Sequence, residues 1–109
     1  MVDTQLDLVF GALAHPTRRA ILARLRSGPA SVGELATPFR VSQQAISKQI
    51  AVLRAAGLVR QIKHGRESRC ELRPLPLQQA DDWIDLYRPL WEERLDQLAD
   101  YLGRPANER

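Results

Sequence analysis

The sequence predicts a mainly α-helical domain with one small β-hairpin, and three observations support this fold class. Apolar residues recur at helical spacing near both ends of the 109-residue chain. Two short helical segments near the middle are joined by the four-residue link FRVS. Two strand-like stretches then flank a glycine-containing turn, which is typical of a hairpin. The expected order is helix, helix, helix, helix, hairpin, helix, within a single domain over residues 1–109.

The first two helices are expected at the N-terminus. Residues 4–13 carry an apolar stripe at three- and four-residue spacing, formed by Leu6, Val9, Phe10 and Leu13. The second helix begins at Pro16, because proline suits a first helical position, and it stops at Gly28.

The next two helices form a helix-turn-helix over residues 31–56. Ser31 and Glu34 have the spacing of a capping box, and Pro38 keeps this helix short. Ser42 is the expected N-cap of the following helix, and Gly57 marks its end. The hairpin over residues 58–72 follows directly, which makes the unit a winged helix-turn-helix with the hairpin as its wing.

A long terminal helix is expected over residues 77–102. Its apolar stripe consists of Trp83, Ile84, Tyr87, Trp91, Leu95, Leu98 and Leu102. Pro89 lies inside this segment and removes one backbone donor. Because the stripe continues in phase across the proline, we expect a kink near residues 85–89 rather than two separate helices.

Charge is unevenly distributed along the chain, although the formal net charge is only +3. Residues 42–73 carry seven Lys or Arg against two acidic residues, whereas residues 74–109 carry four Arg against eight. A basic middle favours a polyanionic partner, and the acidic tail is a separate surface.

The helix over residues 42–56 has an outward face without acidic residues. Its candidate DNA contacts are Ser42, Gln43, Gln44, Ser47, Lys48, Gln49 and Arg54. Gln pairs with adenine and Lys with guanine in the major groove, where the first turns of a recognition helix lie. The alternative is an ordinary solvated face.

Basic side chains also lie at the wing and near the start of the second helix. The wing contributes Lys63, His64, Arg66 and Arg69, which suit phosphates or the adjacent minor groove. A solvated loop is the alternative for the wing. Arg18 is a candidate phosphate contact, but pairing with an acidic residue of the tail is an equal alternative.

Three segments together resemble the ArsR/SmtB family of winged-helix bacterial repressors. They are HPTRRAILARLRSGPASVGELA, VSQQAISKQIAVLRAAGLV and YRPLWEERLDQLADYL, and the resemblance covers about residues 5–102. The family has Pro where Gln44 stands, His where Gln49 stands, and Asp or Ser where His15 stands. The first two departures bear on which operator is read. The resemblance implies a homodimeric repressor that binds an imperfect palindrome in double-stranded DNA.

The residues independently favour a homodimer through the two terminal helices, 4–13 and 77–102. Two tryptophans, a tyrosine and several leucines on one helix exceed what a small domain covers by itself. An obligate interface of this kind buries on the order of 2,000 Å² or more.

The resemblance also locates the positions where relatives bind metals. Residues 34–38 read Glu-Leu-Ala-Thr-Pro, without sulfur, and residues 77–102 contain no histidine. The terminal segment resembles a subgroup without a metal, so we expect no metal and no cofactor. Whether an organic effector binds is left open. The lone Cys70 is expected to be a small buried strand residue.

Other function classes are weighed against this interpretation. The chain has no catalytic constellation and no Gly-rich phosphate loop, so we expect no enzyme. A winged-helix module for protein–protein contact is the alternative, but it would not need a basic wing. The sequence carries no secretory or membrane-spanning segment, which predicts a cytoplasmic protein. No pattern in the sequence identifies the operator or the regulated genes. The sequence also does not distinguish a repressor from an activator.

Overall fold

The computed structural model describes residues 4–103, and its elements follow the predicted order from the N-terminal to the C-terminal helices. The helices are α1 (Thr4–Leu13), α2 (Pro16–Leu25), α3 (Val32–Ala36), α4 (Gln43–Ala55), α5 (Leu75–Asp85) and α6 (Arg88–Tyr101). The strands are β1 (Ala30–Ser31), β2 (Val59–His64) and β3 (Glu67–Leu72), and a 3₁₀ turn over Thr37–Phe39 follows α3. The predicted fold class is confirmed.

The strands form an antiparallel sheet in the order β1-β3-β2. Strands β2 and β3 pair from Val59 with Leu72 to His64 with Glu67, so only Gly65 and Arg66 lie in the turn. Gly65 has φ +62°, a left-handed conformation that glycine adopts without steric cost. The third strand, β1, was not predicted, because two residues are too short to show an alternating pattern.

The core lies where α1, α2, α3 and α4 meet the sheet. Its largest fully buried side chains are Val9, Ile21, Leu35, Ile46, Ile50, Leu53, Leu58 and Cys70. Helix α4 ends at Ala55, and Gly57, the predicted stop, follows two residues later with a φ of +77° that lets the chain turn into β2. The helix-turn-helix and the wing are therefore one packed unit, which we call the head.

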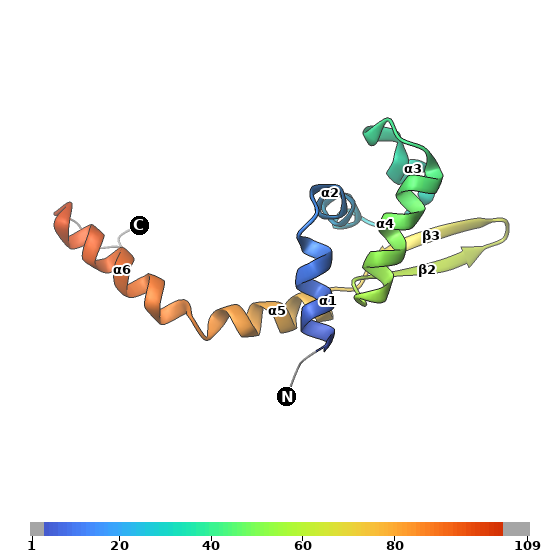
Figure 1. The fold of residues 1–109 in the computed structure, drawn as a ribbon. Helices are drawn as coiled ribbons and strands as arrows, with labels where there is room; N and C mark the ends of the chain where they lie inside the picture. Colours follow the sequence, from blue (N-terminus) through green and yellow to red (C-terminus); the bar gives the residue numbers. More distant parts are fainter. Residues whose placement is uncertain (1–3, 104–109) are drawn as a thin grey trace.

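The C-terminal helices leave the head as an arm (Figure 1). Helix α5 packs against α1, whereas α6 contacts α5 and extends beyond it. Within residues 4–103 no helix has both the length and the apolar character needed to cross a membrane.

The prediction of one kinked helix over residues 77–102 is wrong, because α5 ends at Asp85 and α6 begins at Arg88. Leu86 and Tyr87 donate to Trp83 and Ile84 respectively, three residues back, which tightens and ends α5. Pro89 has no N–H to offer the Asp85 carbonyl and lies in the first turn of α6, where proline is tolerated. The apolar stripe continues in phase across the break, which favoured one continuous helix, but the N–H that Pro89 lacks interrupts the helical hydrogen bonds.

Candidate nucleic-acid interface

Helix α4 presents a polar face to solvent because its apolar side is anchored in the core. Ile46, Ile50 and Leu53 are buried, with at most 1% of each side chain exposed. The Ser42 hydroxyl accepts a hydrogen bond from the Ala45 N–H at 3.1 Å and so caps the helix as predicted. The side chains left exposed on the first two turns are Gln43, Gln44, Ser47 and Lys48.

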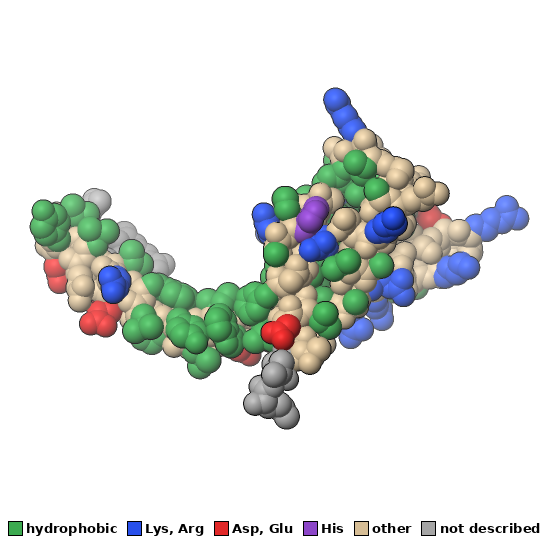
Figure 2. All heavy atoms as spheres, in the orientation of Figure 1, with side chains coloured by type: hydrophobic (Ala, Val, Ile, Leu, Met, Phe, Trp, Pro, Cys, Tyr) green, Lys and Arg blue, Asp and Glu red, His purple; other side chains and the backbone are tan. Residues whose placement is uncertain are grey.

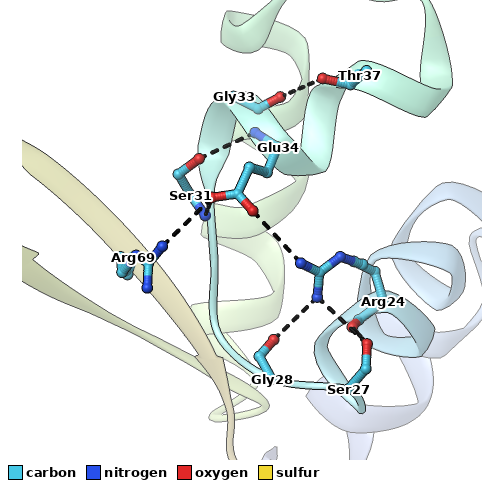
Figure 3. Close-up of polar contacts among 8 residues, drawn as sticks. All are labelled: Arg24, Ser27, Gly28, Ser31, Gly33, Glu34, Thr37 and Arg69. Atoms are coloured by element: carbon cyan, nitrogen blue, oxygen red, sulfur yellow. Dashed lines mark hydrogen bonds and ion pairs between the residues drawn. The ribbon is translucent and has the colours of Figure 1, made fainter.

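Glu34 at the start of α3 contacts residues of three other elements (Figure 3). It completes the predicted capping box with Ser31, accepting from the Ser31 N–H at 3.3 Å. Its carboxylate also lies 3.6 Å from the Arg24 guanidinium of α2 and 3.7 Å from that of Arg69 in β3. Hydrogen bonding to Ser31, through its backbone and side chain, lowers the pKa of Glu34, and the two arginines contribute.

The tip of the wing projects from the rest of the head and carries unpaired basic side chains (Figure 1). Lys63, His64 and Arg66 are exposed, and their side chains make no hydrogen bond or ion pair within residues 4–103. Arg69, predicted as a fourth DNA contact of the wing, is half-buried and paired with Glu34 at the base of the wing. It therefore joins the wing to α3 in this structure.

A polar hollow of about 550 Å³ separates the wing from the helix-turn-helix. Ser31 and Gly33 line it from the α3 side, Gln43 and Ser47 from α4, and Arg66 and Ser68 from the wing. The exposed Glu67 of the wing also lines it, so the hollow combines polar groups from three elements with one acidic side chain.

Three other predicted contacts are occupied inside the chain. Arg54 donates to the Gln61 Oε1 at 2.9 Å, linking α4 to β2. Arg18 donates to the Gln49 Oε1 at 2.8 Å and has no acidic partner from the tail among the described residues. Gln49 is half-buried and lies off the polar face of α4.

Charge separates along the molecule in space as it does along the sequence (Figure 2). Lysine and arginine gather over the wing and the helix-turn-helix, while acidic residues lie on α6 and hydrophobic surface follows α5 and α6. The cationic end of the molecule is therefore the end that carries the polar face of α4.

The predicted dimerisation residues divide between the core and the surface. Val9 is fully buried within the chain, so it supports α1 from inside. Leu6, Phe10 and Leu13 are half-buried at the edge of the core. The seven predicted residues of α5, α6, the link between them and the turn after α6 remain exposed: Trp83, Ile84, Tyr87, Trp91, Leu95, Leu98 and Leu102.

An aromatic cluster joins the arm to α1. The Phe10 and Trp83 rings meet edge to face at 5.5 Å between centroids, and Tyr87 lies 5.0 Å from Trp83. Leu86, Leu90 and Tyr101 extend the exposed apolar surface, with 72%, 62% and 87% exposure. The prediction omitted them because it followed one continuous stripe, whereas α6 begins its own register at Arg88.

Cys70 is fully buried in β3, as predicted, opposite Ala30 and Gln61 in the sheet. Burial raises the pKa of its thiol, although Arg54 opposes this effect. Among residues 4–103, no three His, Cys, Asp or Glu side chains gather as they would around a metal ion.

Comparisons with known proteins agree with this arrangement. A family described as a helix-turn-helix domain matches residues 13–62. An HTH-type transcriptional regulator of Mycobacterium tuberculosis is 44% identical over 102 residues, which cover 94% of this chain and 92% of the relative. The transcriptional repressor SdpR of Bacillus subtilis is 32% identical over 79 residues, which cover 72% and 88% respectively. The crystal structure of an ArsR family transcriptional regulator matches with a TM-score of 0.77 and 40% identity, covering 84% of this chain and 95% of that chain.

Proposed function

Because the chain belongs to the ArsR/SmtB family of winged helix-turn-helix transcriptional regulators, we propose that it represses transcription as a homodimer bound to an imperfect palindrome. Helix α4 reads base edges in the major groove, and the wing contacts phosphates or the adjacent minor groove. The chain is a DNA-binding regulator and not an enzyme, in agreement with these relatives.

One observation carries the proposal. The polar face of α4 has no acidic residue, and it lies beside basic side chains of the wing that have no partner among the described residues. Lys48 on α4 and Arg66 at the wing tip have no partner within residues 4–103, so both charges are available to DNA. Gln43, Gln44 and Ser47 supply the hydrogen-bonding groups that distinguish bases. A protein-binding winged helix would gain nothing from this concentration of unpaired cations.

The exposed arm supports the homodimer. Trp83 and Trp91 are 43% and 37% exposed, and leucines continue the apolar surface along α6. Packing this surface and α1 against a second copy would remove it from water. A two-fold dimer then places its two α4 helices about 34 Å apart, one turn of DNA, which requires a palindromic site.

We propose that this regulator acts without the metal sites typical of its family. The position of the thiolate motif on α3 carries Ala36 and Pro38 instead of cysteine, and α5 and α6 contain no histidine. Repression is therefore either constitutive or relieved by an organic effector.

Binding to DNA is tested with a duplex selected by the native protein from a random library. The affinity is measured by fluorescence anisotropy at several salt concentrations. We expect the affinity to fall steeply as the salt concentration rises. On a plot of the logarithm of the association constant against the logarithm of the salt concentration, the slope is about −0.9 per phosphate contact.

Lys48→Ala and Arg66→Ala are each expected to weaken binding, and loss of a phosphate contact lowers the slope by about 1. Arg73→Ala is the matched control, because Arg73 lies beside Gly57 at the opposite end of α4. If both test variants bind like the control, these contacts are assigned wrongly. If the native protein selects no duplex, the protein-interaction alternative replaces the proposal.

A further inference from the structure

Arg18, near the start of α2, joins three helices with one side chain. Its Nε donates to the Ala12 carbonyl at 2.8 Å, and its Nη2 donates to the Gly11 carbonyl at 3.1 Å. Its Nη1 donates to the Gln49 Oε1 at 2.8 Å. The guanidinium therefore connects the end of α1 to the middle of α4.

The two carbonyls explain why Arg18 has a fixed position. Gly11 and Ala12 lie in the last turn of α1, where carbonyls have no partner within the helix. The Gly11 carbonyl also accepts from the Ala14 N–H, just after the helix, at 3.3 Å. The planar guanidinium donates to both carbonyls from the one edge that carries Nε and Nη2. Nη1 donates to Gln49 on α4, so one side chain links Gln49 directly to the end of α1.

Gln49 does not lie on the polar face of α4. It follows the buried Ile46 by three residues and precedes the buried Leu53 by four, which places all three on one side of the helix. Its side chain is half-buried, whereas Ser47 and Lys48 are exposed. With its amide oxygen bound to Arg18, Gln49 is oriented toward α2 and away from the polar face of α4.

We propose that Arg18 is a positioning residue that holds α4 in its DNA-reading orientation through Gln49, although neither side chain contacts DNA. This inference rests on the proposed function. Helix α1 packs against α5, the first helix of the arm, so the link runs from the proposed dimer interface to the reading helix. Without this link, α4 samples orientations that do not fit the groove. The apparent affinity for DNA then falls in proportion to the fraction of molecules in which α4 has the reading orientation.

Substitution of Gln49 distinguishes positioning from direct contact. Gln49→Glu keeps the acceptor and forms a charge-assisted bond to Arg18, so we expect affinity within about threefold of native. Gln49→Ala removes the acceptor, and we expect a loss on the order of tenfold. If Gln49 contacted DNA directly, the Glu variant would be the weaker of the two, because its charge would repel phosphates.

Salt dependence and a double variant complete the experiment, which uses the same selected duplex. We expect Arg18→Ala to weaken binding like Gln49→Ala with the salt slope unchanged, since no phosphate contact is lost. The double variant should bind no worse than the weaker single variant, because both remove one link. Urea unfolding and sedimentation of each variant confirm that folding and assembly are retained.

Three results would overturn the inference: a Glu variant weaker than the Ala variant, a slope reduced by about 1 in Arg18→Ala, or additive losses in the double variant. If Arg18→Ala unfolds because the end of α1 loses its donors, the inference is tested by comparing the DNA affinities of Gln49→Glu and Gln49→Ala. If the native protein selects no duplex, the proposed function itself is wrong, and this failure is distinct from a failure of the Arg18 inference.

Discussion

At the scale of single residues, the candidate basic contacts fall into two groups, those with a hydrogen-bond or ion-pair partner inside the chain and those without one. Arg18, Arg54 and Arg69 are held by partners inside the chain. Lys48, Lys63 and Arg66 have none within residues 4–103, so their side chains are free to reach DNA. We therefore expect salt dependence to arise from the second group and structural order from the first.

Ser42 has two roles that substitution can separate. Its hydroxyl caps α4, and its position at the first turn places it near the proposed DNA backbone. Ser42→Ala should lower the free energy of unfolding by about 1 kcal/mol, whereas Ser42→Asp, which also caps, should preserve it. Ser42→Asp should still bind DNA more weakly than the native protein, because a carboxylate repels phosphates.

Urea unfolding and anisotropy measure the two effects independently. A Ser42→Asp variant that bound the selected duplex as well as the native protein would place Ser42 away from the phosphates. A fully stable Ser42→Ala variant would show that the cap contributes nothing to folding.

At the scale of elements, Glu34 connects α2, α3 and β3 and so sets the wing relative to the helix-turn-helix (Figure 3). Its pKa is lowered in the folded protein, so its stabilising contribution is fully present above the unfolded pKa of about 4.3. The contribution is lost as the pH falls through the lowered folded pKa, because protonation removes the acceptor charge.

Glu34→Gln tests this assignment. Glutamine keeps the spacing of a capping box but loses the attraction to Arg24 and Arg69. The variant should unfold at lower urea than the native protein at pH 7, and the difference should narrow as the pH falls below about 4.3. If the difference in unfolding between the variant and the native protein stayed the same from pH 7 to below about 4.3, the charge of Glu34 would not contribute to stability.

Local patterns predicted most of these elements because their causes are local. The capping box at Ser31, the cap at Ser42, Pro16 at the start of α2 and the turn at Gly57 each depend on a few neighbouring residues. The partners of Arg18 and Arg69 depend on how distant segments pack, so candidate contacts were named without knowledge of which were occupied. The break at Leu86 depends on the single N–H that Pro89 lacks, and the apolar residues on both sides of it keep one phase, so the sequence pattern does not reveal it.

At the scale of the whole molecule, the arm is the feature that a single chain leaves unexplained. The Cα radius of gyration is 18.3 Å and the extents are 60 × 36 × 21 Å. A compact chain of this length has a radius of about 13 Å. The excess comes from α5 and α6, which carry a long apolar surface away from the core (Figures 1 and 2). Such a surface favours a second copy as its cover.

Leu95→Glu tests the homodimer, because Leu95 is exposed on α6 and lies with Trp91 and Leu98 on one side of the helix. Asp96→Ala is the matched control, since Asp96 lies about 100° further around the helix, toward its acidic side. At micromolar concentration the Leu95 variant should sediment as a monomer, while the control should remain a dimer. Because a monomer binds with one α4 instead of two, its affinity for the selected duplex should fall by at least about 100-fold. A Leu95 variant that stayed dimeric, or a monomer that bound the duplex as tightly as the native protein, would contradict dimeric reading of a palindrome through this arm.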